Sequence, residues 1–277
     1  MAPQSLLITY PLKEFQAWLE CQDKSPNTCR AYLYSIRQFL SIYHEISHEN
    51  LLYYKCYLIE HYKPQTVNLR ISALNSYIEY LNLPFDKLMI VRIQQKSYLE
   101  NVISQADYEY LKNCLLHDGH IKYYFAVHIM ATTGLRISEL VQLQCEDIRN
   151  GYKDICSKGN RIRRVFIPHV VQIPCLKWLH GCKRMSGSLF MNRFGAPIST
   201  TGLRNQLKHL AILYKLIPNV IYPHTFRHLF AKNFIERNDD IAMLADILGH
   251  RSIDTTRIYL RKNRTEQKQI FNQIVTW

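Results

Sequence analysis

The sequence has 277 residues, enough for two domains that each bury a core of their own. Lys and Arg number 35 against 22 Asp and Glu, and the formal net charge of +13 favours a polyanionic partner, either nucleic acid or an anionic membrane surface. No apolar run is long enough to span a bilayer, and residues 1–11 lack the basic flank and apolar core of a secretory signal. We therefore expect a cytoplasmic protein with no role at a membrane and with nucleic acid as its leading partner.

The eight cysteines indicate neither a disulfide framework nor a zinc site. They include no C-x-x-C pair. The closest group of potential ligands is Cys175, His180 and Cys182, whereas a structural zinc site needs four well-placed ligands. Reduced and mostly buried thiols fit this spacing better. We therefore expect no metal ion and no other cofactor.

Four helices separated by breakers are predicted for the first 83 residues. Apolar residues recur at helical spacing in residues 11–21, 50–61 and 64–81, and a fourth helix begins at Ser25-Pro26 and carries its apolar stripe to Leu40. Beyond Asn82 the helical pattern lapses, and residues 82–98 are polar, basic and interrupted by Pro84. This stretch is expected to be a linker, so we expect a first domain over residues 1–97.

Polar side chains gather at the starts of two of these helices. Such residues fit ordinary helix capping and solvated charge, and they fit contacts to phosphates or bases equally well. The sequence leaves both interpretations open. The residues concerned are Asn27, Thr28 and Arg30 in one helix, and Thr66, Asn68 and Arg70 in the other.

The second domain, residues 98–277, is predicted to be mainly α-helical with a small β-sheet. Ser104 begins a helix as a capping residue would, and the helix over residues 121–132 stops at Gly134, directly before a short helix over 137–142. Residues 152–157 and 161–167 then read as two strands around the turn Lys158-Gly159-Asn160. Beyond Pro168 the pattern is again mainly helical, so the fold class is α+β.

A tyrosine near the end of the chain is preceded, at set distances, by histidines and arginines. A phenol can attack a phosphodiester and hold the phosphoryl group covalently, while arginines bind phosphate oxygens and offset the charge that builds during transfer. This chemistry needs no metal. On a basic chain the set points to the cutting and rejoining of DNA. The residues are Arg136, His224, Arg227, His250 and Tyr259.

Each of these motifs has an ordinary structural interpretation when it stands alone. Arg136 lies between two helices with Glu139 three residues on, which also fits a surface ion pair. His224 and Arg227 are three residues apart and face the same way on a helix, a spacing that is more often structural than catalytic. Lys158 at the hairpin tip fits a solvated turn lysine as well as a proton donor. The ordered combination is what carries the prediction.

Four segments resemble the signature boxes of the tyrosine recombinase (phage integrase) family. They are ATTGLRISEL, SKGNRIRRVFIP, HTFRHLFA and LGHRSIDTTRIYL. The chain is most similar to compact members such as the Xer recombinases and transposon-borne resolvases or integrases. The resemblance implies a catalytic domain preceded by a four-helix (SAM-like) core-binding domain, which together close around DNA as a C-shaped clamp.

The same resemblance implies a role for each residue of the set. Arg136 and Arg227 would bind the scissile phosphate, and Lys158 would protonate the leaving 5′ oxygen. His224 would take the acid/base position, His250 would hydrogen-bond the phosphate, and Glu139 would support the arginines. Tyr259 would be the nucleophile that forms a 3′-phosphotyrosyl bond.

The family also implies a partner and an assembly. The partner is a double-stranded recombination site with inverted-repeat half-sites, bound by a dimer and paired into a tetrameric synapse. Integration, excision and resolution are all possible outcomes. Two other functions compete with recombination: a type IB topoisomerase-like nicking and closing enzyme, and a catalytically silent DNA-binding regulator on the same fold.

Overall fold

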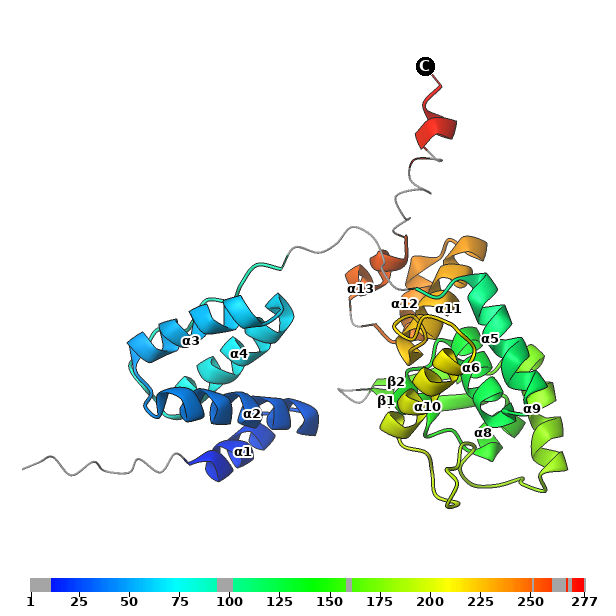
Figure 1. The fold of residues 1–277 in the computed structure, drawn as a ribbon, viewed down its shortest axis with the longest axis horizontal. Helices are drawn as coiled ribbons and strands as arrows, with labels where there is room; N and C mark the ends of the chain where they lie inside the picture. The colour runs from blue at the N-terminus through cyan, green and yellow to red at the C-terminus, as the bar shows by residue number, and fades with distance from the viewer. Residues whose placement is uncertain are drawn as a thin grey trace, which may run out of the picture. The chain divides into compact units, whose positions relative to one another are not determined.

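The computed structural model describes residues 11–93, 102–157, 161–250 and 252–260, together with residue 268 and residues 271–276. The chain divides into two compact units, Met1–Gln95 and Lys96–Trp277 (Figure 1). We call them the N-terminal unit and, after the catalytic domain expected from the sequence, the catalytic unit. No helix within the described ranges is both long enough and apolar enough to cross a lipid bilayer.

The four helices predicted for the N-terminal unit are present. Two of them begin at serine caps: Ser25 Oγ accepts a hydrogen bond from the backbone N–H of Thr28, and Ser47 Oγ accepts one from that of Asn50. The helices are α1 (Leu12–Cys21), α2 (Pro26–Tyr43), α3 (His48–His61) and α4 (Pro64–Tyr80).

Aromatic side chains fill much of the core of the N-terminal unit. Phe15, Phe39, Tyr54 and Tyr77 are almost completely buried. The Tyr54 hydroxyl donates to Gln38 Oε1 (2.8 Å), so the polar end of that buried ring has a partner. Apolar residues at helical spacing on all four helices supply most of the rest of the core.

The expected linker begins as a strap that is bound to α4. Two asparagines of this helix each form a pair of 2.8–2.9 Å hydrogen bonds to the backbone of one strap residue. Asn75 pairs with the N–H and C=O of Leu88, and Asn68 pairs with those of Val91. The Leu88 side chain is buried in the core of the unit. Residues 88–91 therefore belong to the N-terminal unit, and the amide of Asn68 is engaged within the protein.

The prediction of a mainly helical second domain with a small β-hairpin is confirmed. Strands β1 (Tyr152–Ser157) and β2 (Arg161–Phe166) are antiparallel, with Tyr152 opposite Phe166. The helices are α5 (Gln105–His117), α6 (Ile121–Thr133), α7 (Ile137–Leu140), α8 (Cys145–Asn150), α9 (His169–Gly181), α10 (Thr200–Leu213), α11 (Pro223–Arg237), α12 (Ile241–Leu248) and α13 (Ile253–Arg257), followed by the 3₁₀ helix η1 (Ile258–Leu260).

Helix α6 is the centre of the catalytic unit. Its residues from Phe125 to Ala131 are all buried, as expected for a helix that is apolar on every side. Helices α5, α9 and α11 pack around it. Because α6 is held on all sides, the residues at its C-terminal end have a fixed position.

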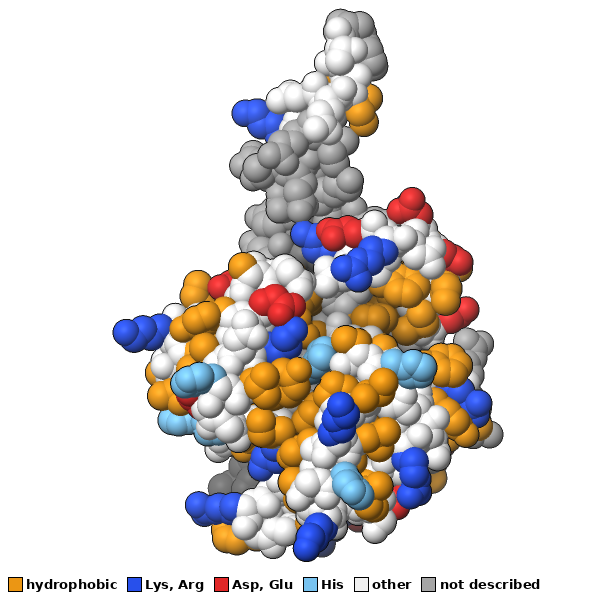
Figure 2. All heavy atoms as spheres, turned by 90° about the vertical axis from the view of Figure 1, so that its right-hand side faces the viewer, with side chains coloured by type: hydrophobic (Ala, Val, Ile, Leu, Met, Phe, Trp, Pro, Cys, Tyr) orange, Lys and Arg blue, Asp and Glu red, His pale blue; other side chains and the backbone are white. Residues whose placement is uncertain are grey.

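On the face seen in Figure 2, Lys and Arg side chains stand singly among hydrophobic ones and form no continuous basic band.

Candidate active site

Arg136 is placed by the end of one helix and the start of the next. Gly134 caps α6 in the left-handed conformation (φ +66°), where a Cβ atom would lie 2.6 Å from a ring carbon of Phe230. Arg136 then caps α7. Glu139 accepts hydrogen bonds from the Arg136 backbone N–H (2.8 Å) and from Nη1 (3.0 Å). The carboxylate therefore fixes both the backbone and the guanidinium of Arg136.

Arg227 is buried and forms no ion pair with a carboxylate of the described residues. Only 3% of its surface is exposed. Its guanidinium donates to the carbonyl oxygens of Gly134 (2.6 Å) and Leu248 (2.7 Å), which lie at the C-terminal ends of α6 and α12. These carbonyls lack helical partners and carry the negative end of each helix dipole. Burial, followed by the charge of Arg136, lowers the pKa of Arg227 to about 10, so it stays charged at neutral pH.

His250 is held between Arg227 and Thr256. Arg227 Nη2 lies 3.0 Å from His250 Nε2, and His250 Nδ1 lies 2.8 Å from Thr256 Oγ1. Because a guanidinium only donates, Nε2 is the acceptor. In the neutral ring the proton is therefore on Nδ1, which donates to the buried hydroxyl of Thr256.

Tyr259 on η1 lies against two histidine rings. Its ring is stacked on His250 (centroids 6.2 Å apart, planes at 15°) and tilted against His228 (5.4 Å). The side chain is only 6% exposed. Burial raises the pKa of the phenol, and the positive charge of Arg227 and a hydrogen bond from it act in the opposite direction. The phenol is therefore protonated at neutral pH and lies beside the cation that would stabilise its anion.

The histidines of the site are neutral in this environment. Burial lowers the pKa of His250 to about 4, and the charges of Arg227, Arg136 and Arg163 add to the shift. Loss of solvation and the charges of Arg227 and Arg136 also lower the pKa of His224. A neutral imidazole can accept a proton, so both groups can act as bases.

The structure brings most of the predicted residues together. Arg136, Glu139, Arg227, His250 and Tyr259 form one cluster at the ends of α6 and α12, and His224 lies one turn before Arg227 on α11. Lys158 lies outside the described residues. No group of three or more His, Cys, Asp or Glu side chains within the described ranges is arranged to hold a metal ion.

Two residues of the cluster did not stand out in the sequence. Arg163 on β2 forms a 2.8 Å ion pair with Glu139, whereas the sequence indicated only that it lies in a predicted strand. Thr256 is completely buried and fixes His250. No short-range pattern marks either residue, because their partners lie 24 and 6 positions away on other elements.

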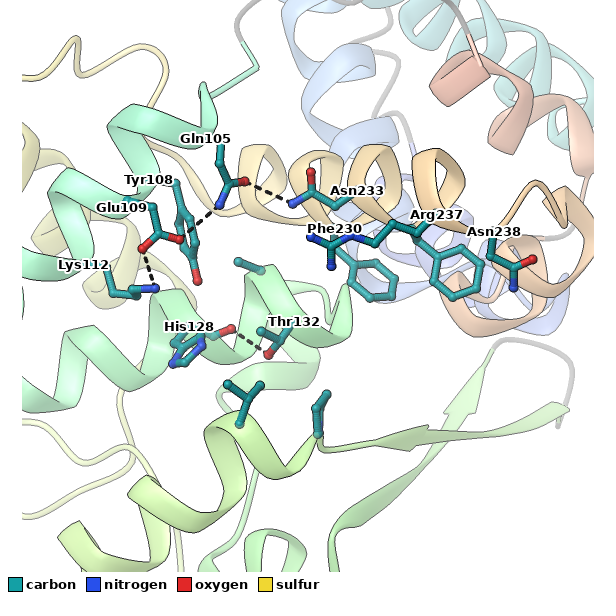
Figure 3. A pocket seen from close by; sticks show the side chains of 14 residues that line it. Gln105, Tyr108, Glu109, Lys112, His128, Thr132, Phe230, Asn233, Arg237 and Asn238 are labelled. Carbon is teal, nitrogen blue, oxygen red and sulfur yellow. Dashed lines mark hydrogen bonds and ion pairs between the residues drawn. The ribbon is translucent and has the colours of Figure 1, made fainter.

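A pocket of about 470 Å³ lies between α5, α6, the start of α9 and α11 (Figure 3). Its wall is largely apolar, with Tyr108, Val170, Phe230 and Phe234, and it includes the buried imidazole of His128. No residue of the predicted site lines it. Helix α11 thus contributes its first turn to the catalytic cluster and its second half to this separate pocket.

Comparison with known protein families identifies the family of this chain. The model of the phage integrase family matches residues 101–266, more than half of the chain, including every element that carries the cluster. The chain belongs to the phage integrase family. The resemblance seen in the four sequence boxes is thereby confirmed.

Individual members of the family match almost the whole chain. The tyrosine recombinase XerA of Pyrococcus furiosus is 28% identical over 264 residues, which cover 93% of this chain and 91% of that protein. A TnP I resolvase of Bacillus thuringiensis is 26% identical over 281 residues, covering 92% and 96%. The similarity therefore extends over most of this chain and most of each relative.

Solved structures share the fold at lower sequence identity. The Tn1549 transposon integrase in complex with transposon right end DNA superposes with a TM-score of 0.70 at 16% identity, covering 96% of this chain and 99% of that one. A crystal structure of XerA recombinase gives a TM-score of 0.55 at 22% identity, covering 96% and 98%.

Proposed function

We propose that this phage integrase family member is a site-specific DNA recombinase that cleaves and rejoins duplex DNA through a 3′-phosphotyrosyl intermediate. The observation that carries the proposal is the position of Tyr259, buried against His250 and beside Arg227. A phenol in a structural core has no need of unneutralised arginines, whereas a phenol that becomes an anion during attack does.

In the proposed reaction Tyr259 Oη attacks the scissile phosphorus and gives its proton to His224. The bond between phosphorus and the 5′ oxygen breaks, and that oxygen takes a proton from Lys158. Arg136 and Arg227 bind the non-bridging oxygens. Rejoining reverses these steps with a 5′ hydroxyl as the nucleophile. One phosphodiester is exchanged for another, so the reaction requires no nucleotide cofactor.

His250 must change its protonation when DNA enters. Its Nε2 accepts a hydrogen bond from Arg227 in the free protein, but a phosphate oxygen offers only lone pairs. To hydrogen-bond the phosphate, Nε2 has to carry a proton. The negative phosphate favours this protonation, and the Thr256 hydroxyl remains hydrogen-bonded to Nδ1 in either form.

The proposed substrate is double-stranded DNA with inverted-repeat half-sites. Residues 1–97 would act as the core-binding domain and residues 98–277 as the catalytic domain, closing on the duplex as a C-shaped clamp. The net charge of +13 supports a polyanionic partner, and XerH site-specific recombinase, a structural neighbour, is bound to its difH substrate. Action on DNA supports a cytoplasmic location.

The proposed assembly is a dimer on each site and a tetramer in the synapse. Near the C-terminus, Phe271 and Ile274 are 65% and 62% exposed on a short helical stretch. The pocket between α5, α6 and α11 offers an apolar wall of matching character. We assign it as the acceptor for the C-terminal residues of a second copy, because buried aromatic and aliphatic anchors dominate such contacts.

The proposal is tested with a nicked suicide duplex that is built from inverted repeats flanking the gene. The intact protein should form a covalent adduct, and Tyr259→Phe should bind the duplex equally well but form none. An adduct on the Phe variant would show that Tyr259 is not the nucleophile.

The same duplexes test the proposed assembly. Phe271→Asp should weaken cooperative filling of a full site and leave binding to a half-site unchanged. Unchanged cooperativity would exclude docking of the C-terminal residues on a second copy.

The two competing functions give different results in this assay. A type IB topoisomerase-like enzyme would relax supercoiled plasmids that lack the repeats. A silent regulator would bind the duplex without forming an adduct, at any pH. The intact cluster around Tyr259 favours neither competitor, and no feature of the described residues points to one.

A further inference from the structure

A third arginine lies in the active-site cluster, beside the pair that the family motif supplies. The side chain of Arg163 is only 10% exposed, and it projects from β2 toward the ends of α7 and α12. Its neighbour on the same strand, Arg164, points the other way and pairs with Asp154 at the surface, where its side chain is 48% exposed. The alternation along the strand thus sends one arginine inward and the other outward.

Arg163 and Arg136 share one carboxylate. Glu139 Oε2 accepts from Arg163 Nη2 (2.8 Å) and from the Arg136 backbone N–H (2.8 Å), while Oε1 accepts from Arg136 Nη1 (3.0 Å). Burial acts to raise the pKa of Glu139, but these hydrogen bonds and charges lower it. Without Arg163, Glu139 would be held from one side only and would be free to turn together with Arg136.

Arg163 also packs directly on the residue before His250. Gly249 ends α12 in the left-handed conformation (φ +63°), and a Cβ atom there would lie 2.5 Å from Arg163 Nη1 and 2.9 Å from its Cδ. The Gly249 carbonyl also accepts a 3.4 Å hydrogen bond from Arg136 Nη2. Arg163 therefore supports the backbone from which His250 projects.

The cluster holds an excess of two positive charges, because three guanidinium groups face one carboxylate. Arg163 Nε and Nη1 are buried and have no hydrogen-bond partner among the described residues. Buried and incompletely paired cations are destabilising in the free protein, and an anion bound beside them relieves that strain. Arg163 thus adds to the positive potential around His250.

We propose that Arg163 is a positioning residue of the active site, which holds Glu139 and Arg136 on one side and Gly249 and His250 on the other. The inference rests on the proposed function. It deepens that function by naming the group that keeps the two halves of the phosphate-binding cluster in register. The described contacts of Arg163 are to Glu139 and Gly249, so its role is to position these residues and not to react itself.

The experiment compares Arg163→Met with Arg164→Met, two neighbouring arginines of the same strand that differ in direction. Arg163→Met should slow single-turnover adduct formation by up to about 100-fold, the loss that a misplacement of reacting groups by about 1 Å can cause. DNA affinity should change less than twofold. Arg164→Met should leave the rate unchanged. Equal rates in the two variants would overturn the inference.

A double-mutant cycle separates positioning from general instability. If Arg163 acts through Glu139, adding Arg163→Met to Glu139→Gln should slow the reaction much less than it slows the wild type. Fully additive effects, with all variants folded at the assay temperature, would contradict the inference.

A titration of the histidine rings by NMR needs no DNA. His250 lies among Arg136, Arg163, Arg227 and His228, so removal of one charge in Arg163→Met should raise its pKa relative to Arg164→Met. No difference would overturn the inference. If instead the titration differs as expected but the wild type forms no adduct, the proposed function fails and the positioning role stands.

Discussion

Each unit of the protein buries an arginine that makes no ion pair among the described residues, but the surroundings of the two are opposite. In the N-terminal unit, Arg70 is 7% exposed and lies 4.0 Å from the ring centre of Tyr62 and 5.7 Å from that of Tyr34. In the catalytic unit, Arg227 is 3% exposed, contacts helix-end carbonyls and has Arg136 as a charged neighbour.

The difference separates a buried cation that the fold stabilises from one that the fold leaves ready for an anion. Aromatic faces attract the guanidinium of Arg70, although its buried Nη1 has no hydrogen-bond partner among the described residues. Arg227 has two like-charged neighbours, Arg136 and Arg163, and their repulsion is unfavourable until a phosphate arrives. Burial of a charged side chain alone therefore does not mark a functional site. The presence of other side chains of the same charge beside it does.

The largest predicted effect is the difference in reaction rate between substitution of Arg227 and substitution of Arg70. Arg227→Met should slow adduct formation at least about 10²–10³-fold, because it removes donors that stabilise charge in the transition state. Arg70→Met should leave the rate within about twofold and lower the stability of the N-terminal unit by about 1 kcal/mol, the scale of a cation–π contact. Single-turnover kinetics and chemical denaturation measure both. Comparable rate losses at equal DNA affinity would erase the distinction.

Acid should destabilise the catalytic unit more than the N-terminal unit. Burial lowers the pKa of His128, His228 and His250 to about 4, against an ordinary value of 6.5. Between these two pH values the unfolded state binds more protons than the folded state, so stability falls as the pH falls from about 6.5 to about 4. Hydrogen exchange of the full chain, compared between pH 7 and pH 5, should show lost protection in peptides of α6, α11 and α12.

His128→Leu provides the control, because it removes one of the three groups without touching the catalytic cluster. This variant should lose less protection between pH 7 and pH 5 than the wild type does. If the peptides of α1 to α4 lose protection first, the acid sensitivity lies in the other unit and the comparison is wrong.

The smallest predicted effect comes from comparing a glycine at the active site with a glycine elsewhere in the same unit. Gly249 and Gly119 both have a positive φ, but a Cβ at Gly119 would meet nothing within 4 Å. Gly119→Ala should cost about 1 kcal/mol of backbone strain and no activity. Gly249→Ala should cost the same strain and also displace Arg163, slowing cleavage several-fold. Equal kinetics for the two variants would show that the contact with Arg163 tolerates movement.

The sequence predicted the elements and the family because those signals are local or ordered along the chain. Ser25 and Ser104 marked helix starts, and Gly134 marked a helix end, by rules that involve only a few neighbouring residues. The proposed catalytic set was found because its members keep a fixed order and spacing. The roles of those residues remain predictions.

Contacts between distant segments were not accessible in this way. Arg163 lies in a predicted strand and Thr256 lies three residues before Tyr259, and no local pattern indicates the partner of either side chain. Asn68 fitted a phosphate contact at a helix start, but its amide binds Val91, 23 residues later. Periodicity gives the face of an element and not the residue that it meets, so these partners emerged only from the folded chain.

The strap on α4 has a consequence for where the molecule can be cut. Helical periodicity ends near residue 83, which invites a truncation there, but a fragment ending at that point would lose Leu88 and Val91. It would expose an apolar groove and leave the amides of Asn68 and Asn75 without their backbone partners. Limited proteolysis should instead spare the chain up to residue 91. A stable N-terminal fragment thus ends about ten residues later than its last helix does.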